Sequence, residues 1–168
     1  DDGTYTLVGL GSGTYRVRAC PSCWGDNPYA DEYYDNADWK NASPVTVVVG
    51  ETTTGINFAL DAATSISGTV YGWDSSSSSY VPLADAEISL ENIATGSYDG
   101  WAQTEADGSY TIGGIVAGSY RVRAHADSYT AKYYPNSSDW GGAEAVMTTI
   151  DEPATGIDFQ LDLGGQIS

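Results

Sequence analysis

The sequence predicts an all-β protein made of tandem β-sandwiches, each with about seven short strands. One observation is composition: the 168 residues include 20 glycines, 13 tyrosines and a single methionine, and no stretch has a helical apolar period. Such a composition favours turn-rich β-structure. The other observation is an internal repeat, and a fixed period of this kind sets the architecture of a chain.

The repeat is densest in two hairpin segments. Residues 2–19 read DGTYTLVGLGSGTYRVRA and residues 107–124 read DGSYTIGGIVAGSYRVRA, a spacing of 107 − 2 = 105. Further on, Gly55 matches Gly156 and the spacing falls to 156 − 55 = 101, so a loop of variable length lies between. We expect the C-terminal part of one β-sandwich repeat at 1–64 (the first copy), a complete repeat at 65–163 (the second copy) and the start of the next at 164–168.

The second copy opens with alternating strands. Residues 65–71 are a predicted strand because β-branched residues alternate with polar ones. Residues 72–80, GWDSSSSSY, are an expected polar loop, since the serine run has no apolar face. Residues 86–91 are the next strand, with Ile88 and Leu90 on one face. After a turn at 94–97, a returning strand starts at 100–104.

The repeated hairpin comes next. Asp107-Gly108 is a tight-turn dipeptide, because glycine takes positive φ without penalty. We expect Gly113-Gly114 to break the strand, and Arg121 and Arg123 to leave on the face opposite Tyr120, Val122 and Ala124. The arginines are expected to point outward against the acidic surface, with an anion site as the alternative. Further strands are predicted at 146–150 and 155–161, matching 45–49 and 54–60 in the first copy.

The two cysteines, Cys20 and Cys23, lie in the CPSC of the first copy. A thioredoxin-like site would need a βαβ context, and a zinc site would need two more ligands, whereas the single histidine, His125, lies in the other copy. We predict a local disulfide that pins a loop outside the cell. A reduced or intermolecular pair is the alternative.

The net charge of −17 argues against nucleic-acid binding, because phosphates need lysines and arginines and this chain has 6. The scattered acids predict a solvated, mutually repelling surface, with a salt-rich or calcium-rich habitat as the alternative. No apolar run approaches the ~20 residues of a membrane helix. No signal peptide is visible, and since the sequence starts inside the repeated motif, we expect a mature or cut segment.

The order of ISGTV, PLADAEISL, ADGSYTIGGIVAGSYRVRA and TGIDFQL resembles the carboxypeptidase-regulatory-like domains, with their prealbumin-like (Ig-like) β-sandwich. The collagen-adhesin B-type repeats of bacterial surface proteins are similar. The resemblance covers 65–162 in full and 2–61 as the C-terminal part of a preceding copy. It implies a non-catalytic scaffold, often in tandem, in secreted or surface proteins.

Some of the resembling adhesins carry a Lys–Asn isopeptide crosslink whose lysine lies on the first strand. Here the lysines are Lys40 and Lys132, and 65–71 has none, so no crosslink is expected. Some resembling domains bind calcium near the Asp-Gly hairpin, where Glu105 and Asp107 are the acids available.

Carboxylates that could bind calcium also gather in the variable loop of the first copy. The candidates are Asp31, Asp35 and Asp38, beside Glu32, and calcium takes about six to eight oxygen ligands. The second copy keeps only Asp139 of this set. A plain solvated loop is therefore the alternative, and no other cofactor is expected.

Two N-glycosylation sequons begin at Asn41 and Asn136, and both flank the Asp-Trp pair of the variable loop. If the chain is secreted, glycans on both asparagines are predicted. The tryptophans could bind carbohydrate, because flat rings stack on sugars. Trp39 and Trp140 occupy matched positions in the two copies, which favours instead a role in packing the loop on the sandwich or on the neighbouring repeat. The full set is Trp24, Trp39, Trp73, Trp101 and Trp140.

The sequence carries no catalytic set. A serine triad needs a base and a G-x-S-x-G elbow, and here there is one histidine and no elbow. A glycosidase needs two carboxylates around a cleft, and a small sandwich with acids in its turns offers no obvious cleft. We therefore predict that the chain is not an enzyme.

The function that fits these observations is a structural repeat of an extracellular filament, stalk or surface fibre. Its partners would be copies of itself or neighbouring repeats, stacked end to end. The alternative is an accessory adhesion module that binds carbohydrate or a cell surface. The first copy lacks the strands that 65–104 supply in the second, and its apolar strand edges would be open. A fibre would fill that gap with more of the same chain or with a neighbouring subunit.

Overall fold

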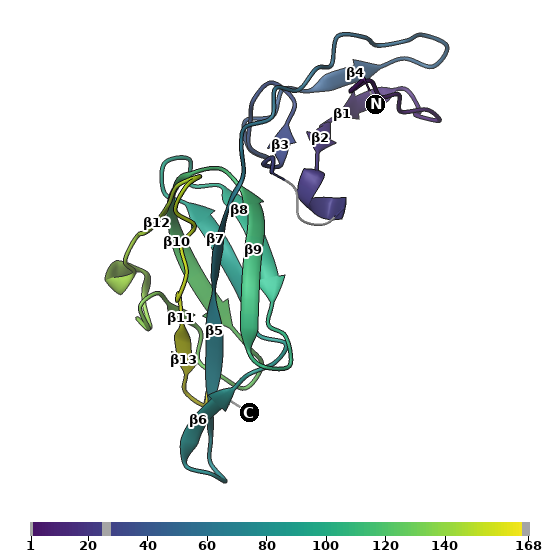
Figure 1. The fold of residues 1–168 in the computed structure, drawn as a ribbon. Helices are drawn as coiled ribbons and strands as arrows, with labels where there is room; N and C mark the ends of the chain where they lie inside the picture. Colours follow the sequence, from purple (N-terminus) through teal and green to yellow (C-terminus); the bar gives the residue numbers. More distant parts are fainter. Residues whose placement is uncertain (1, 25–27, 166–168) are drawn as a thin grey trace. The chain divides into compact units, whose positions relative to one another are not determined.

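The computed structural model describes residues 2–24 and 28–165, which fold into two compact units (Figure 1). Unit 1 consists of Asp1–Ala19 and Glu32–Leu60, and unit 2 consists of Cys20–Asp31 and Asp61–Ser168. The chain therefore passes from one unit to the other three times. Strands are the main regular secondary structure, although those of unit 1 are few and short, and the described helices are the short 3-10 turns η1 (Pro21–Trp24) and η2 (Trp140–Gly142).

Unit 2 is a sandwich of two sheets, which confirms the predicted all-β class. In the first sheet the order is β11-β10-β7-β8, with β12 paired to β10. In the second the order is β13-β5-β6, with β9 also paired to β5. The pair β13–β5 is parallel and the other pairs are antiparallel. The bounds are β5 (Thr64–Asp74), β6 (Ser79–Pro82), β7 (Glu87–Asn92), β8 (Tyr98–Gln103), β9 (Ser109–Ile115), β10 (Gly118–His125), β11 (Lys132–Tyr133), β12 (Val146–Thr148) and β13 (Phe159–Leu161).

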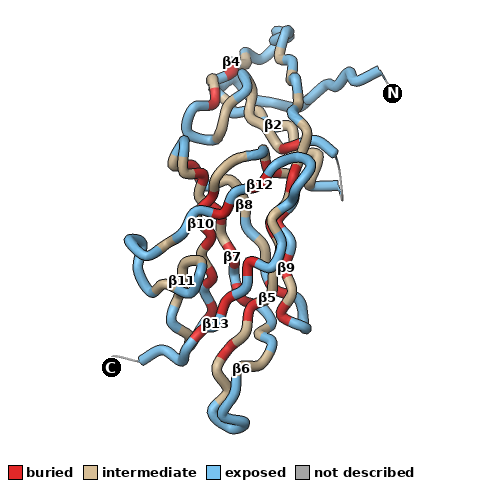
Figure 2. Tube along the Cα trace, turned by 60° about the vertical axis from the view of Figure 1, so that its left-hand side comes forward, coloured by how far each residue is buried: buried red, intermediate tan, exposed pale blue. Residues whose placement is uncertain are grey.

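The core of unit 2 lies between the two sheets and follows the predicted alternation. Because successive side chains point to opposite faces of a strand, every second residue reaches the core. Arg121 and Arg123 lie on the other face of β10, as predicted, and are partly exposed. Figure 2 shows buried segments concentrated along these strands. The fully buried set includes Ile66, Val70, Ile88, Leu90, Tyr120, Val122, Phe159 and Leu161.

Two core tyrosines carry their hydroxyl groups into the sandwich. Tyr110 donates to the carbonyl oxygen of Ile157 at 2.7 Å, and Tyr120 donates to that of Val116 at 2.8 Å. Burial raises the pKa of both tyrosines, and the nearby Asp158 carboxylate raises the pKa of Tyr110 further. Each hydroxyl therefore stays neutral and its donor is satisfied, as buried polar groups require.

Two local predictions in the second copy are wrong. The expected loop at 72–80 is mostly a hairpin, because β5 continues to Asp74 and β6 starts at Ser79. Trp73 and Tyr80 face each other across it with ring centroids 5.2 Å apart, which supplies an apolar contact that the serine run lacks. The strand does not break at Gly113-Gly114 either: β9 reaches Ile115, and the irregularity appears as a register shift against β5.

The described residues of unit 1 form four short strands: β1 (Gly13–Tyr15), β2 (Arg18–Ala19), β3 (Glu32–Tyr33) and β4 (Val45–Val47). The pair β1–β4 matches β10–β12, and β2–β3 matches β10–β11. The strand predicted at 54–60 does not form. Its counterpart β13 pairs only with β5, and the described residues of unit 1 include no equivalent of β5.

The predicted division of the chain differs in two respects from the compact units. The segment Cys20–Asp31 and residues 61–64 lie in the first copy by sequence but belong to unit 2. The predicted start of a third repeat at 164–168 falls partly outside the described residues, which end at 165. That boundary stays a prediction. In the described ranges, no helix has the length and hydropathy of a membrane span.

Candidate functional site

The segment Cys20–Asp31, here called the junction loop, is built into unit 2 through backbone hydrogen bonds. The Asp31 N–H donates to the carbonyl oxygen of Gly114 at 2.9 Å, and the Ala30 N–H donates to that of Asp61 at 2.8 Å. In the opposite direction, the Ala63 N–H donates to the Pro28 carbonyl oxygen at 2.8 Å. Ala30 is buried. A loop between β2 and β3 of unit 1 thus forms a short ladder with the linker that leads into β5.

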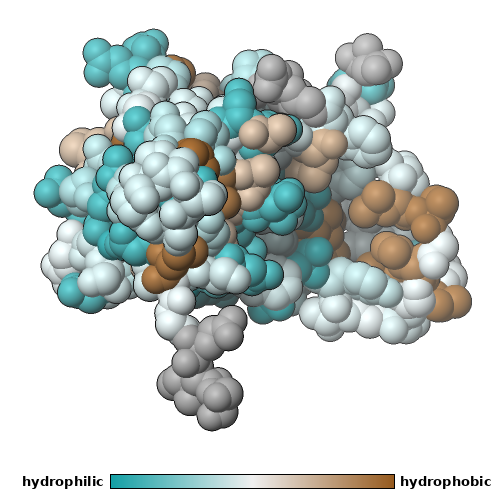
Figure 3. Space-filling model, turned by 90° about the horizontal axis from the view of Figure 1, so that it is seen from below, coloured by the Kyte–Doolittle hydropathy of each residue, from teal (hydrophilic) through white to brown (hydrophobic). Residues whose placement is uncertain are grey.

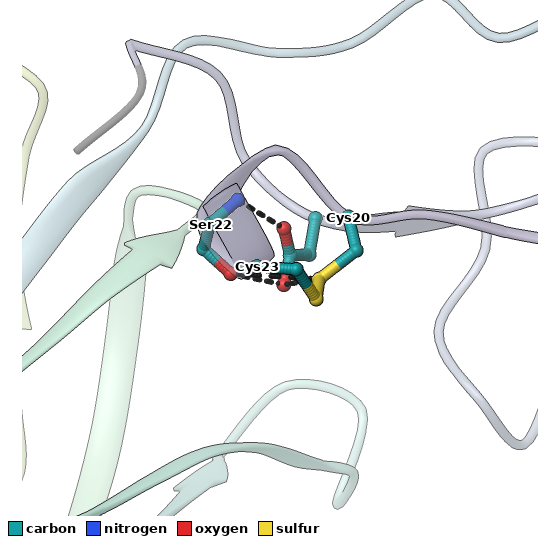
Figure 4. The surroundings of a disulfide bond; sticks show 4 residues. Cys20, Ser22 and Cys23 are labelled. Carbon is teal, nitrogen blue, oxygen red and sulfur yellow. Dashed lines mark hydrogen bonds between the residues drawn. A yellow bond between two sulfur atoms is a disulfide. The ribbon is translucent and has the colours of Figure 1, made fainter. Parts of the chain in front are cut away.

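The predicted disulfide is present at the start of this loop, where it joins Cys20, just before η1, to Cys23 within η1 (Figure 4). The Asp31 carboxylate accepts hydrogen bonds from the Ser22 N–H at 3.1 Å and from the Ser22 hydroxyl at 2.6 Å. The disulfide and this carboxylate together fix the turn, so that Ser22 is held against the sheet rather than left mobile.

The place where the loop meets the sheet is Gly114. This residue has φ +71, and a Cβ added to it would lie 2.6 Å from the Ser22 Cβ. Glycine is needed for two reasons, since the backbone is left-handed and the loop leaves no space for a side chain. Its counterpart Gly9 has φ +79 but nothing within 4 Å of an added Cβ. The close approach therefore distinguishes two glycines with the same backbone conformation.

These two glycines give a matched test of the loop contact. Gly114→Ala and Gly9→Ala should each cost about 1–2 kcal/mol, because alanine is strained at positive φ. Only Gly114→Ala should also displace the junction loop, and we expect faster hydrogen exchange at the Ala30 and Asp31 amides in that variant alone. Exchange spectra of both variants check this. Equal effects on these amides would show that Ser22 does not seat the loop on Gly114.

The same ladder recurs after β10 in the second copy. The Thr130 N–H donates to the Asp162 carbonyl oxygen at 2.8 Å, and the Gly164 N–H donates to the Ser128 carbonyl oxygen at 2.8 Å. Tyr129 forms a bridge with Leu163, as Tyr29 does with Ala62. The second loop is shorter and has no cysteines. The loop–linker ladder is therefore the element that repeats, and the disulfide is an addition to one copy.

A side-chain cluster secures the second ladder. The Asp162 carboxylate accepts the Tyr80 hydroxyl at 2.5 Å and pairs with the Lys132 ammonium group at 2.9 Å. The Tyr80 hydrogen bond, followed by Lys132, lowers the pKa of Asp162 below its usual range. The contacts join the end of β13 to β6 and β11. The Asp162 carboxylate is largely exposed, so these contacts should add little to the free energy of unfolding. Their role is to position the three strands.

Residues 65–162 match the family model of the Carboxypeptidase regulatory-like domain. The chain belongs to this family. The match spans more than half of the sequence and coincides with the strands β5–β13, so the resemblance drawn from the repeated motifs is confirmed. A search of curated proteins finds no match.

Two solved structures are similar to this regulatory-like chain at low identity. A chain of a type II Cohesin-X-Dockerin complex from Acetivibrio cellulolyticus has 19% identity and a TM-score of 0.38, over 60% of this chain and 58% of that one. The minor pilin of Streptococcus agalactiae has 14% identity and a TM-score of 0.45, over 96% of this chain and 65% of that one. In both cases less than two thirds of the other protein is covered. These likenesses are too distant to bear on function.

The calcium candidates of the regulatory-like chain are not brought together. Asp31 holds Ser22 in unit 2, whereas Asp35 accepts the Ser43 hydroxyl at 2.7 Å in unit 1. Asp38 accepts the backbone N–H groups of Lys40 and Asn41 at 2.8 and 3.0 Å. In the part of the chain that the structure describes, no group of three or more His, Cys, Asp or Glu side chains is placed to hold a metal. Calcium binding stays a prediction.

The two sequon asparagines lie on exposed loops. The Asn41 side-chain amide donates to the Asp38 carboxylate at 3.0 Å. The Asn136 side-chain oxygen accepts the Gln160 N–H at 2.7 Å. Exposure is what a glycan acceptor requires, and N-glycosylation at both sites stays a prediction.

The matched tryptophans stack under arginines on the outer face of each unit. Arg16 lies 4.6 Å from the Trp39 ring centroid, and Arg121 lies 4.2 Å from that of Trp140. Each tryptophan also contacts a tyrosine edge to face, Tyr33 at 5.6 Å and Tyr133 at 5.9 Å. This matches the packing role favoured from sequence.

The junction ladder was not found from sequence. Its contacts are backbone hydrogen bonds, which place few demands on side chains and so leave a weak sequence pattern. The signal that could have located it is the pair Tyr29 and Tyr129, which occupies equivalent places beside the two linkers.

Proposed function

We propose that this regulatory-like chain is a non-catalytic structural part of an extracellular filament, stalk or surface fibre whose β-sandwich repeats stack end to end. The observation that carries the proposal is the junction loop, because residues between two strands of unit 1 are hydrogen-bonded into unit 2. The recurrence of the ladder at residues 128–130 and 162–164 supports a junction of the same kind after each repeat.

The connections between the units favour a mechanical role. The chain passes between them at residues 19–20, 31–32 and 60–61. A scaffold role is supported by three covalent connections in place of the single flexible linker of a beads-on-a-string protein.

The disulfide supports a location outside the cell. Disulfides persist in oxidising compartments and are rare where thiols are kept reduced. The high negative charge keeps such a chain soluble and mutually repelling along its sides, so association would be limited to the ends that carry complementary backbone contacts. The partners proposed are neighbouring repeats.

A second candidate, a carbohydrate-binding adhesion module, is favoured by one feature. Tyr98 and Trp101 are both more than half exposed on β8, an edge strand of the first sheet. Flat exposed rings can stack on sugars. Trp39 and Trp140, the tryptophans at matched positions, already contact arginines. Tyr98 and Trp101 are therefore the exposed rings to test.

Electron microscopy of the native material, combined with oligosaccharide binding, separates the two candidates. A structural repeat should appear as rods or fibres of regular width, and Trp101→Ala should leave them unchanged. Dispersed compact particles that bind an oligosaccharide, with binding lost in Trp101→Ala, would instead establish the adhesion module. Freely bending chains of beads would contradict the stacked arrangement.

A further inference from the structure

Two exposed aromatic rings share the outer face of β8, the edge strand of the first sheet of unit 2. Tyr98 and Trp101 are 57% and 58% exposed. Residues three positions apart on a regular strand point to opposite faces of the sheet. Here the buried Leu90 of β7 pairs with Gly100. The next residue of β7 pairs with Tyr98, so β8 carries one extra residue. This β-bulge turns both rings to the outer face.

Cross-strand pairing extends this outer face over β7 and β10. Side chains at paired positions of neighbouring strands lie on the same side of a sheet. Two rows of three side chains result. Each row runs from an aromatic ring across β7 to an arginine on β10, about 10 Å away. The rows are Tyr98, Glu91 and Arg121, and Trp101, Ser89 and Arg123. These six residues are here called the platform.

Aromatic rings also border the arginine side of the platform. The Arg121 guanidinium carbon lies 4.2 Å from the Trp140 ring centroid. Tyr133 on β11 pairs with Arg123 and meets Trp140 edge to face. Trp140 is still 48% exposed, so its ring packs on the arginine and also faces solvent. The polar side chains of the platform therefore lie between aromatic rings on both sides.

These polar side chains are not used by the protein itself. Among the described residues, the charged groups of Glu91, Arg121 and Arg123 form no ion pair and no hydrogen bond. Glu91 and Arg121 occupy paired positions, yet their charged groups do not meet. All three residues are partly exposed. Their hydrogen-bonding groups are therefore available to a ligand.

The chemistry of these groups indicates the class of ligand. An arginine only donates hydrogen bonds and an ionised glutamate only accepts them, whereas a sugar hydroxyl does both. An anionic ligand would need donors alone, and the net charge of −17 would repel it. On the outer side of β7 and β10, Glu87 and Glu91 balance Arg121 and Arg123. A neutral ligand rich in hydroxyl groups matches this balance.

The mixture of rings and charges also separates the platform from a plain apolar patch. Figure 3, seen from the end that carries β6, shows hydrophobic residues gathered in a few groups. Apolar patches of that kind usually mark protein contacts. On the platform each ring is followed by polar side chains, which suits a ligand that has apolar ring faces and hydroxyl edges.

We propose that the platform binds a polysaccharide of neutral sugars. Tyr98 and Trp101 would stack on the sugar rings, while Glu91 and Arg123 would bond to hydroxyl groups between them. The inference rests on the carbohydrate-binding candidate above and adds the ligand class and the polar contacts. It is compatible with the filament role, because stacking would use the ends of a repeat and binding would use a sheet face.

Affinity electrophoresis tests the proposal. The gels contain hydroxyethyl cellulose, xyloglucan, galactomannan, laminarin or soluble starch as neutral probes, and polygalacturonate as the anionic probe. We expect at least one neutral polysaccharide to slow migration, with an affinity that added salt leaves unchanged, because stacking and hydroxyl hydrogen bonds involve no counter-charge. Polygalacturonate should not slow migration.

Matched variants locate the binding. Trp101→Ala and Arg123→Lys should each weaken binding about 10-fold, as the loss of a central interface contact does. Lysine keeps the charge but lacks the planar fork of donors. Trp24→Ala is the control, since Trp24 is 93% exposed but lies in η1, outside the platform, and binding should be unchanged. Thermal unfolding checks the fold, and Tyr98→Ala replaces Trp101→Ala if that variant is destabilised.

Three results would overturn the proposal. One is migration that none of the neutral polysaccharides slows. Another is preferential binding of polygalacturonate that salt abolishes, which would make the arginines an anion site. The third is equal weakening by Trp24→Ala and Trp101→Ala. The filament role is judged separately by microscopy: fibres that bind no neutral polysaccharide would uphold that role and overturn this inference, and dispersed particles that bind one would do the reverse.

Discussion

Replacing Phe159 with alanine is expected to destabilise unit 2 by about 3–5 kcal/mol. The side chain is fully buried between the sheets, and its ring contacts Tyr134 with centroids 6.2 Å apart. Truncation removes apolar area from the core and leaves a cavity that the surrounding strands cannot fill. Urea unfolding, with exchange at 109–115 as a probe specific for unit 2, measures the loss.

Phe58→Ala is the matched control for this substitution. Phe58 has the same aromatic partner at the same separation in unit 1, yet it is only partly buried. Since less apolar area leaves water when unit 1 folds, we expect a loss well below that of Phe159→Ala. Losses of equal size would show that Phe58 is packed as tightly as Phe159.

Gly68→Ala is the second substitution with a large expected effect. A Cβ at Gly68 would lie 2.1 Å from the carbonyl oxygen of Ile157, and the neighbouring backbone atoms are also too close. The segment before β13 would have to move away from β5, which breaks the hydrogen bond from the Ile157 N–H to the Ser67 carbonyl oxygen. We expect a loss of about 1–3 kcal/mol or more, measured by urea unfolding.

Gly113→Ala is the control for Gly68→Ala. It also lies within a strand, but an added Cβ there meets nothing within 4 Å and its φ is not positive. Its stability should change little, or rise slightly because alanine has less freedom to lose on folding. A Gly68→Ala protein as stable as this control would mean that β13 can shift without cost.

The sequence was most informative where local pattern and tertiary environment agree. Tyr120, Val122 and Ala124 alternate with Arg121 and Arg123, and the structure buries the first three and leaves the arginines outside. The Cys20–Cys23 bridge was also predicted, because the sequence offers neither the βαβ context of a redox site nor the two further ligands of a zinc site.

The segments TGINFAL and TGIDFQL show where local pattern stops being sufficient. Both alternate in the same way, yet only the second contains a strand, β13. A strand exists only when its backbone groups have a partner, and the partner β5 is present in unit 2 alone. The serine-rich segment 72–80 shows the opposite error, because its local pattern predicts a loop whereas the structure has a hairpin. The contact between Trp73 and Tyr80 joins residues on both sides of the serine run.

The three passages of the chain between units have a consequence for resistance to proteolysis. Proteases cut exposed loops first, and in a protein with one linker a single cut separates its domains. Here a cut within the junction loop leaves residues 60–61 intact as a covalent connection. The Cys20–Cys23 bridge also keeps the ends together if the bond between them at Ser22 is hydrolysed. The connection between repeats can thus outlast a first nick.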